Sequence, residues 1–177
     1  MRIITGKYKG RHFEVPRSFS ARPTTDFAKE NLFNVLQAYI DFDEAPTALD
    51  LFSGTGSITL ELVSRGCGRV ISVELEGRHH RLIKQFLDKL QDTTALPVRG
   101  DVFQFLAKCR EQFDFIFADP PYVLPQIPEL PDIVLSRNLL KEGGLFVLEH
   151  GKQNNFSQHP RFVEHRSYGS VNFSFFQ

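Results

Sequence analysis

The sequence Asp119-Pro120-Pro121-Tyr122 places a carboxylate, two rigid residues and an aromatic ring directly after a short apolar run. An exocyclic amine of a nucleobase is a poor nucleophile, because its nitrogen lone pair is delocalised into the ring. Two acceptors for the amine protons would favour a pyramidal nitrogen and expose that lone pair. We expect the Asp119 carboxylate and the Pro120 carbonyl to be these acceptors, with Tyr122 stacked on a flipped-out base. The alternative interpretation is a rigid turn without chemistry.

A second group of residues predicts a nucleoside-like ligand at the ends of successive strands. A Gly54-x-Gly56 loop joins a strand pattern to a helix pattern, Glu74 ends the next strand pattern, and Asp101 ends the third. Glycine lets the backbone approach a ligand, and free N–H groups at a helix start favour an anionic group. Glu74 can accept hydrogen bonds from ribose hydroxyls, and Asp101 from an adenine amine.

The loop favours S-adenosylmethionine over a nicotinamide cofactor. The dinucleotide fingerprint has a third glycine, but that position is Thr59 here. Glu74 would repel the 2′-phosphate of NADP. S-adenosylmethionine has no phosphate, and its methionine carboxylate is an anion that the loop can hold. The expected product is S-adenosylhomocysteine, and a nicotinamide-dependent oxidoreductase is the alternative of a different class.

The composition is that of a globular protein. The 177 residues suit one domain, with 41% hydrophobic and 24% charged residues. No apolar run approaches the roughly 20 residues that span a bilayer, and the start lacks the apolar region of a signal peptide. Cys67 and Cys109 form no CxxC pair, which is typical of a reducing compartment. We therefore expect a cytoplasmic protein without membrane contact.

Histidines and isolated acids give weaker signals. His79-His80 lacks the spacing of a metal site, so no metal is expected. Glu149-His150 follows a strand pattern and could line the pocket or lie on the surface.

Positive charge is concentrated in the first 25 residues, although the formal net charge of the chain is +0. Glu14 is the one acid of this segment, against Arg2, Lys7, Lys9, Arg11, Arg17 and Arg22. Such asymmetry favours a basic arm that binds nucleic-acid phosphates. The alternative is a solvated edge hairpin.

Alternating patterns predict an α/β, Rossmann-like fold with a mostly parallel sheet. Apolar runs predict strands at 47–52, 69–73, 95–98, 113–118 and 144–148. Amphipathic spacing predicts helices at 57–65, 77–90 and 102–108, and a weaker one near 130–138. Two further segments, 162–168 and 171–176, predict an antiparallel hairpin at the edge of the sheet.

An extension precedes this core. Residues 2–15 predict two short strands around a Gly6…Gly10 turn. Thr24-Thr25-Asp26 then predicts the start of a helix that runs to about Ile40, with Phe27, Leu32, Phe33 and Leu36 on its apolar face. We expect one domain over residues 1–177, in which 1–40 form the basic extension and helix and 41–177 form the catalytic core.

The whole pattern resembles the RsmD-type family, which methylates N2 of a guanine in small-subunit (16S) ribosomal RNA. The specific similarity lies in Arg2-Ile3-Ile4-Thr5-Gly6-Lys7-Tyr8-Lys9-Gly10-Arg11 and in Arg22-Pro23-Thr24-Thr25-Asp26 with Glu30-Asn31-Leu32-Phe33. Asp50–Ser57, Glu74, Asp101 and Asp119–Tyr122 extend it over nearly the whole chain.

The resemblance implies a seven-stranded methyltransferase sheet that binds S-adenosylmethionine. It implies cofactor contacts from Asp50, Phe52, Ser53, Gly54, Gly56, Glu74, Leu75, Asp101 and Val102. Asp119 and Tyr122 would hold the target base, and Pro120 and Pro121, which lie between them in the sequence, belong to the same catalytic motif. RNA contacts would come from Lys7, Lys9, Arg11, Arg22, Thr24 and Thr25. The expected partner is ribosomal RNA, within a small subunit recognised by its shape, and the expected state is a monomer.

Two departures from the family pattern bear on the choice of target. Lys29 stands where the family usually has Arg, and the loop after Tyr122 holds Pro125, Pro128 and Pro131. One alternative is an adenine-N6 methyltransferase acting on DNA or another RNA. A catalytically silent RNA-binding module is the other.

Overall fold

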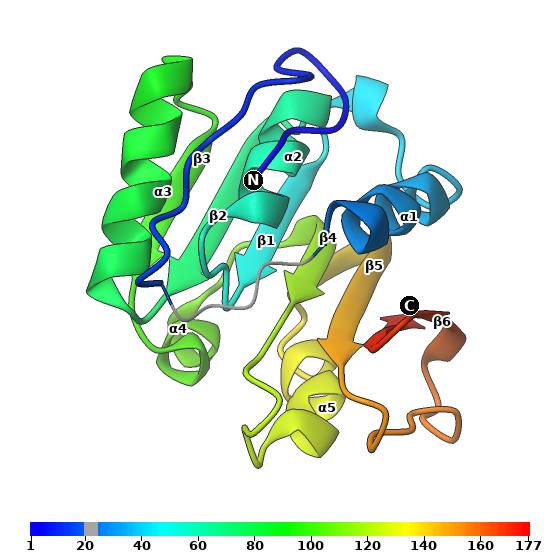
Figure 1. The fold of residues 1–177 in the computed structure, drawn as a ribbon. Helices are drawn as coiled ribbons and strands as arrows, with labels where there is room; N and C mark the ends of the chain where they lie inside the picture. The colour runs from blue at the N-terminus through cyan, green and yellow to red at the C-terminus, as the bar shows by residue number, and fades with distance from the viewer. Residues whose placement is uncertain (20–24) are drawn as a thin grey trace.

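Seven strands form one sheet in the order β3-β2-β1-β4-β5-β7-β6 (Figure 1). Strands β1 to β5 are parallel, and β7 lies antiparallel between β5 and β6. The strands are β1 (Thr47–Leu51), β2 (Arg69–Glu74), β3 (Ala95–Arg99), β4 (Phe113–Ala118), β5 (Leu140–His150), β6 (Phe162–Tyr168) and β7 (Val171–Phe176). The computed structural model describes residues 1–19 and 25–177. It confirms the mostly parallel, seven-stranded sheet with a C-terminal hairpin.

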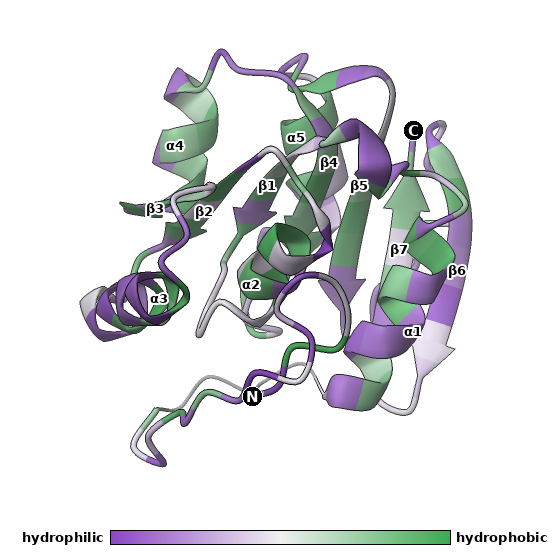
Figure 2. Cartoon of the chain, turned by 90° about the horizontal axis from the view of Figure 1, so that it is seen from above, coloured by the Kyte–Doolittle hydropathy of each residue, from purple (hydrophilic) through white to green (hydrophobic). Residues whose placement is uncertain are grey.

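Helices cover both faces of the sheet, because the strands β1 to β5 are apolar on both sides. One apolar cluster joins one face of the sheet to α1 (Asp26–Leu36), α2 (Ser57–Arg65) and α3 (Gly77–Leu90). A second joins the other face to α4 (Val102–Lys108) and α5 (Leu130–Leu135). Figure 2 shows the hydrophilic sides of α1 and α3 turned away from the sheet. No helix in the described part of the chain is long and apolar enough to cross a membrane.

The strand order reverses between β1 and β4, which are neighbours in the sheet although β2 and β3 separate them in sequence. In open parallel sheets, ligands bind in the crevice outside the carboxyl ends of the strands at such a switch point. The loops that follow β1 and β4 carry Gly54 and Asp119. The topology therefore brings the two predicted chemical motifs to the same edge.

The N-terminal arm (residues 1–19) packs across α2 and then runs alongside α3 (Figure 1). The buried Glu61 carboxylate accepts hydrogen bonds from the backbone N–H groups of Ile4 at 2.8 Å and Thr5 at 3.0 Å. Ser64 accepts from the Tyr8 N–H at 3.0 Å. The two strands predicted for residues 2–15 are reduced to one antiparallel bridge, Arg2–His12. A regular ladder is interrupted because the backbone N–H groups of Ile4, Thr5, Lys7 and Tyr8 bond to α2 instead of to another strand.

The described elements differ from the predicted ones mainly at their ends. Helix α1 stops at Leu36 rather than Ile40, since the Ala38 N–H bonds to Val35 in a tighter turn. Phe27 was predicted on its apolar face but is 66% exposed. Strand β5 is longer than the predicted strand at 144–148. The helix predicted near 130–138 corresponds to α5, which follows a 3₁₀ turn, η2 (Ile127–Glu129), and ends at Leu135.

Candidate active site

One cavity of about 840 Å³ opens at the carboxyl edge of the sheet. Its size is within the range of about 300–1,000 Å³ that is typical of small-molecule sites. Predicted residues from several separate loops contribute to its walls. They are Asp50, Phe52, Ser53, Gly54, Glu74, Leu75, Asp101, Val102, Asp119, Pro120, Pro121 and Tyr122. The cavity thus brings together the residues predicted for the base and those predicted for the cofactor, except Gly56, which is not among its lining residues.

The loop after β1 has an unusual backbone. Phe52 has a φ of 58°, a left-handed conformation that is rare for an aromatic residue and clusters at functional sites. Gly54 has a φ of 54° and Gly56 a φ of 83°. A side chain at Gly56 would place its Cβ 2.8 Å from Cγ1 of Ile83 on α3. Glycine is therefore required at Gly56 both for the turn and for close packing of the loop on α3.

We expect Gly56→Ala to lower the free energy of unfolding by roughly 2–5 kcal/mol, the sum of a left-handed backbone cost and overpacking. Gly143→Ala is the matched control, because Gly143 has a φ of 73° but nothing within 4 Å of its Cβ position. It should cost only about 1–2 kcal/mol. Urea denaturation of both variants measures the difference. Equal losses would show that contact with Ile83 does not constrain the loop.

Glu74 is fixed in the cavity wall by backbone groups of two loops. Its Oε2 accepts a hydrogen bond from the Gly54 N–H at 2.7 Å, and its Oε1 accepts from the Glu76 N–H at 2.7 Å. An ionised carboxylate has acceptor sites for about four hydrogen bonds, so both oxygens can accept more. Glu74 is therefore preorganised to receive hydroxyl donors from a molecule in the cavity.

Asp50 lies deeper, at the end of β1. It is buried, and its Oδ2 accepts a hydrogen bond from the Thr59 hydroxyl at 2.5 Å. Burial raises the pKa of Asp50 to about 7, although the Thr59 hydrogen bond opposes this shift. Near neutral pH the protonated and the ionised form of this carboxyl are therefore both populated.

We expect the stability of the cofactor-free protein to fall between about pH 4 and pH 7 through Asp50. In the unfolded chain the Asp50 carboxyl loses its proton near pH 4, whereas in the folded protein its pKa is about 7. The folded state binds the extra proton within this window, so the free energy of unfolding decreases as the pH rises. Asp50→Asn should remove this component while keeping an acceptor for Thr59. Urea denaturation at several pH values measures it, and parallel profiles for both proteins would contradict it.

The loop after β4 holds the second half of the site. The Asp119 N–H donates to the Leu51 carbonyl at 3.3 Å, which ties this loop to β1. The Tyr122 hydroxyl donates to Oε1 of Glu149 at 3.0 Å. Glu149 and His150 are both buried in β5, and Glu149 lines the cavity. The surface position considered for this pair is wrong, because β5 extends to His150.

Asp101 and Thr25 act as helix caps. Asp101 accepts a hydrogen bond from the Gln104 N–H at 2.9 Å at the start of α4, and Asp101 also lines the cavity. Thr25 accepts from the Ala28 N–H at 3.2 Å, which confirms its predicted capping character. Arg22 and Thr24, predicted near the pocket mouth, lie outside the described residues.

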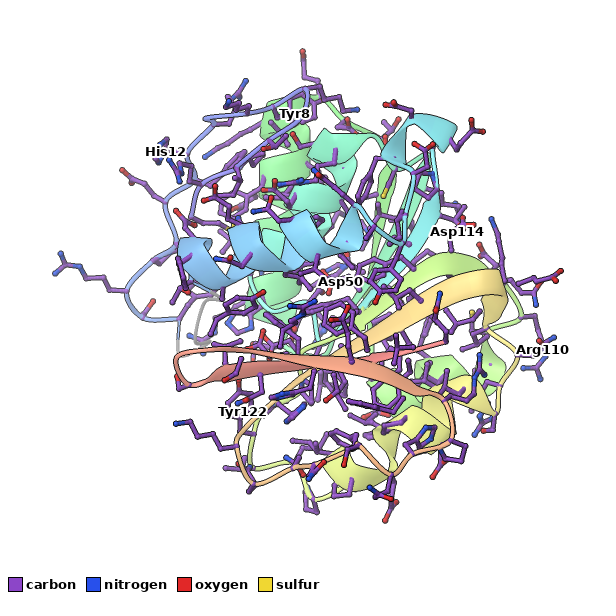
Figure 3. The ribbon with its side chains drawn as sticks, turned by 90° about the vertical axis from the view of Figure 1, so that its right-hand side faces the viewer. Tyr8, His12, Asp50, Arg110, Asp114 and Tyr122 are labelled. Carbon is purple, nitrogen blue, oxygen red and sulfur yellow. The ribbon has the colours of Figure 1, made fainter. Side chains whose placement is uncertain are left out.

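Lys7, Lys9 and Arg11 are not at the cavity. Lys7 forms an ion pair with Asp92 at 2.7 Å, just beyond the last turn of α3, whereas the cavity is at the first turns of the helices. Figure 3 shows the same separation, with Tyr8 at one end of the molecule and Tyr122 toward the other. Their predicted contact with RNA stays a prediction, now for a region at a distance from the cavity.

Lys29 lies behind the glycine loop. It is buried, and its Nζ donates to the Arg2 carbonyl at 2.6 Å and to the Ser57 hydroxyl at 3.1 Å. Burial lowers the pKa of Lys29, and the nearby Glu61 carboxylate opposes that effect. The lysine thus links the arm to the start of α2. In the loop after Tyr122, Leu124 reaches the cavity and Pro128 lies within η2.

Sequence reasoning missed several cavity residues. His79, in the first turn of α3, lies with Nδ1 3.8 Å from Glu74 Oε1 and packs on the Phe19 ring at 5.0 Å. The sequence signal for a place at the cavity was that His79 follows closely after the end of a predicted strand. Arg99 and Val171 also line the cavity, and only the fold brings them there. Within the described ranges, no group of three or more His, Cys, Asp or Glu residues could hold a metal ion.

The family model described as conserved hypothetical protein 95 matches residues 1–177. The chain belongs to this family, the RsmD-type family. RsmD-type relatives are similar over most of their length. Ribosomal RNA small subunit methyltransferase D of Haemophilus influenzae is 33% identical over 86% of this chain and 79% of its own. The protein of the same name from Escherichia coli K12 is 29% identical over 90% and 79%, respectively.

Solved structures share this fold. A hypothetical protein of Thermus thermophilus is 30% identical and superposes with a TM-score of 0.87, over 100% of this chain and 99% of its own. A precorrin-6y C5,15-methyltransferase from Geobacter metallireducens has a TM-score of 0.71 at 16% identity, over 93% of both chains. The latter shows the fold alone. The RsmD-type chain has the Rossmann-like fold of S-adenosylmethionine-dependent methyltransferases.

Proposed function

We propose that the protein transfers a methyl group from S-adenosylmethionine to the exocyclic N2 of a guanine in small-subunit (16S) ribosomal RNA. One observation carries this proposal. The glycine loop with Glu74 and the Asp119–Tyr122 motif line a single cavity. A nucleoside cofactor held by the first group would face a base held by the second.

The cavity residues fit S-adenosylmethionine. Glu74 would accept hydrogen bonds from the ribose hydroxyls, with Leu75 packed beside the adenosine. Asp101 and the start of α4 at Val102 would bind the adenine ring. The backbone of Phe52, Ser53, Gly54 and Gly56 would hold the methionine end, near the partly protonated Asp50. When bound, the cofactor supplies an electrophilic methyl group on a sulfonium centre.

The chain would activate the target amine by accepting its protons. The Asp119 carboxylate would take one N–H and the Pro120 carbonyl the other, so that the nitrogen lone pair points at the methyl carbon. This nitrogen would receive the methyl carbon of the cofactor, which would leave as S-adenosylhomocysteine, with the electrons of the broken carbon–sulfur bond on sulfur. The methylated amine then releases one proton to solvent. Alignment and electrostatic preorganisation would provide the rate, without a strong base or a metal.

The substrate assignment is supported by the relatives, whose names state ribosomal RNA of the small subunit. The chain is a single catalytic domain in this proposal, with residues 1–40 as its extension. A monomer of this size would recognise a subunit by shape rather than by a long sequence. Such work would take place in the cytoplasm.

Methyl incorporation from labelled S-adenosylmethionine tests the proposal. Unmodified small subunits, naked small-subunit ribosomal RNA, transfer RNA and duplex DNA would be compared, followed by nucleoside analysis. We expect N2-methylguanosine from the ribosomal RNA. Detection of N6-methyladenine would contradict guanine as the target base and would support adenine N6 as the methyl acceptor. A protein that binds the cofactor but labels none of these nucleic acids would contradict the proposal.

We expect Tyr122→Phe to retain turnover within about fivefold, because the ring that stacks on the base is kept and one hydrogen bond of about 1 kcal/mol is lost. Tyr122→Ala should lower kcat/KM for RNA roughly 10- to 100-fold, since base stacking contributes about 1–3 kcal/mol. Steady-state kinetics on the same RNA measures both. Equal losses would assign the role to the hydroxyl bonded to Glu149 rather than to the ring.

A further inference from the structure

The N-terminal arm reaches from the far end of α3 to the cavity. Three contacts mark its course along the helix. Arg11 donates from Nη2 to the Lys89 carbonyl at 3.3 Å in the last turn, and the Phe13 and Phe86 rings lie 4.6 Å apart near the middle. Phe19 packs on His79 in the first turn, and His79 lines the cavity. The arm therefore runs antiparallel to α3 and ends at the pocket.

Basic side chains remain exposed on both sides of this contact. The arm buries Phe13 against α3 and leaves Lys9, Arg11 and Arg17 in solvent. Helix α3 buries its apolar side and exposes Arg78, Arg81 and Lys89. We call this surface the arm–α3 face, defined by Lys9, Arg11, Arg17, Arg78, Arg81 and Lys89.

Acidic residues offset only part of this charge. Glu14 lies on the arm, Asp88 is exposed on α3, and Glu76 pairs with Arg78 at 3.7 Å. Of the residues that the structure describes, none forms an ion pair with Arg17, Arg81 or Lys89. With 14 residues, α3 is about 21 Å long at about 1.5 Å per residue. A positive surface of this length can contact several successive phosphates.

We infer that the arm–α3 face binds the phosphate backbone of the RNA that flanks the target base. The inference rests on the proposed function, and it adds Arg17, Arg78, Arg81 and Lys89 to the RNA surface. It also gives Lys9 and Arg11 a role although they are far from the reacting amine. RNA that delivers a base to Asp119 continues past His79 and along α3. Phosphate contacts position such a strand without reading its sequence.

The double variant Arg17→Glu/Arg81→Glu tests this inference. The control is Lys108→Glu/Arg110→Glu, which changes the charge equally at exposed residues at the end of α4, on the other face of the sheet. Binding of naked small-subunit ribosomal RNA would be measured at several salt concentrations. The first variant should weaken binding at least 10-fold, and the slope of log K against log salt should become less negative by about 1.5, for two lost contacts. The control should bind RNA within about twofold of wild type, because we expect few phosphate contacts there.

Cofactor affinity and kcat at saturating RNA should be unchanged in the face variant. Wild-type binding of RNA by the face variant, while the wild-type protein methylates RNA, would overturn this inference and leave the proposed function intact. Equal weakening in the control, or an unchanged salt slope, would overturn it too. A defect seen only with assembled subunits would mean that the face contacts a ribosomal protein, which would also overturn it. If the charge reversals impair folding, Arg17→Gln/Arg81→Gln gives the same comparison with smaller effects.

Discussion

Asp119→Ala is expected to lower kcat by about 100- to 1,000-fold and to leave the Kd for S-adenosylmethionine unchanged. Losses of this size are typical when one preorganised group that stabilises developing charge is removed. Asp119 would hold the amine as positive charge develops on its nitrogen, and the cofactor would be held from β1, β2 and β3. Single-turnover kinetics and equilibrium binding measure the two effects separately.

Asp114→Asn is the control, because Asp114 lies near the start of β4, whereas Asp119 directly follows the end of this strand. Its Oδ2 accepts from the Thr47 N–H at 2.7 Å and from Lys141 Nζ at 2.8 Å. This substitution should lower the melting temperature and leave kcat near wild type. A comparable loss of cofactor binding in Asp119→Ala would mean that Asp119 holds the cofactor rather than the base.

Glu74→Ala is expected to weaken S-adenosylmethionine binding roughly 10- to 100-fold. Hydrogen bonds to a charged group contribute about 1.5–3 kcal/mol, and the variant also releases the Gly54 and Glu76 N–H groups that shape the wall. Binding of RNA without cofactor should not change. Isothermal titration calorimetry with the cofactor and a filter-binding assay with RNA test these outcomes.

Glu76→Ala removes a neighbouring carboxylate and serves as the control. Its Oε1 accepts from the Arg78 N–H at 3.2 Å, so its main role is to cap α3. We expect a loss of stability with little change in cofactor affinity. If both variants bind the cofactor equally, the net charge of the loop, and not the position of Glu74, determines binding.

The central fold could be predicted because its signals are local. The helices at 57–65, 77–90 and 102–108 and the strands at 113–118, 162–168 and 171–176 have their predicted limits. Each is defined by apolar periodicity together with a capping or turn residue at its end. Three strand ends with Gly, Glu and Asp then located the cavity, since parallel strands present their carboxyl ends at one edge.

The arm and the end of β5 could not be predicted in this way. The arm depends on Glu61 and Ser64, which lie 57 and 56 residues away from their partners Ile4 and Tyr8, and no local pattern indicates such pairing. Glu149 is a charged residue at the end of an apolar run, and the same sequence pattern is found where a strand ends at the protein surface. Its burial follows from β7, which pairs Phe173 with it on the other side of β5.

The distance in sequence between the arm and its partners also determines when the arm can dock during synthesis. Tyr8 donates to Oδ2 of Asp92, 84 residues later in the chain. At about 5–20 residues per second, a ribosome needs roughly 4–17 s to make that stretch. The arm is made before α3 and cannot dock on it during this interval, so the nascent chain carries the cations of the arm on an undocked segment. The arm–α3 face is therefore completed only after α3 has been made.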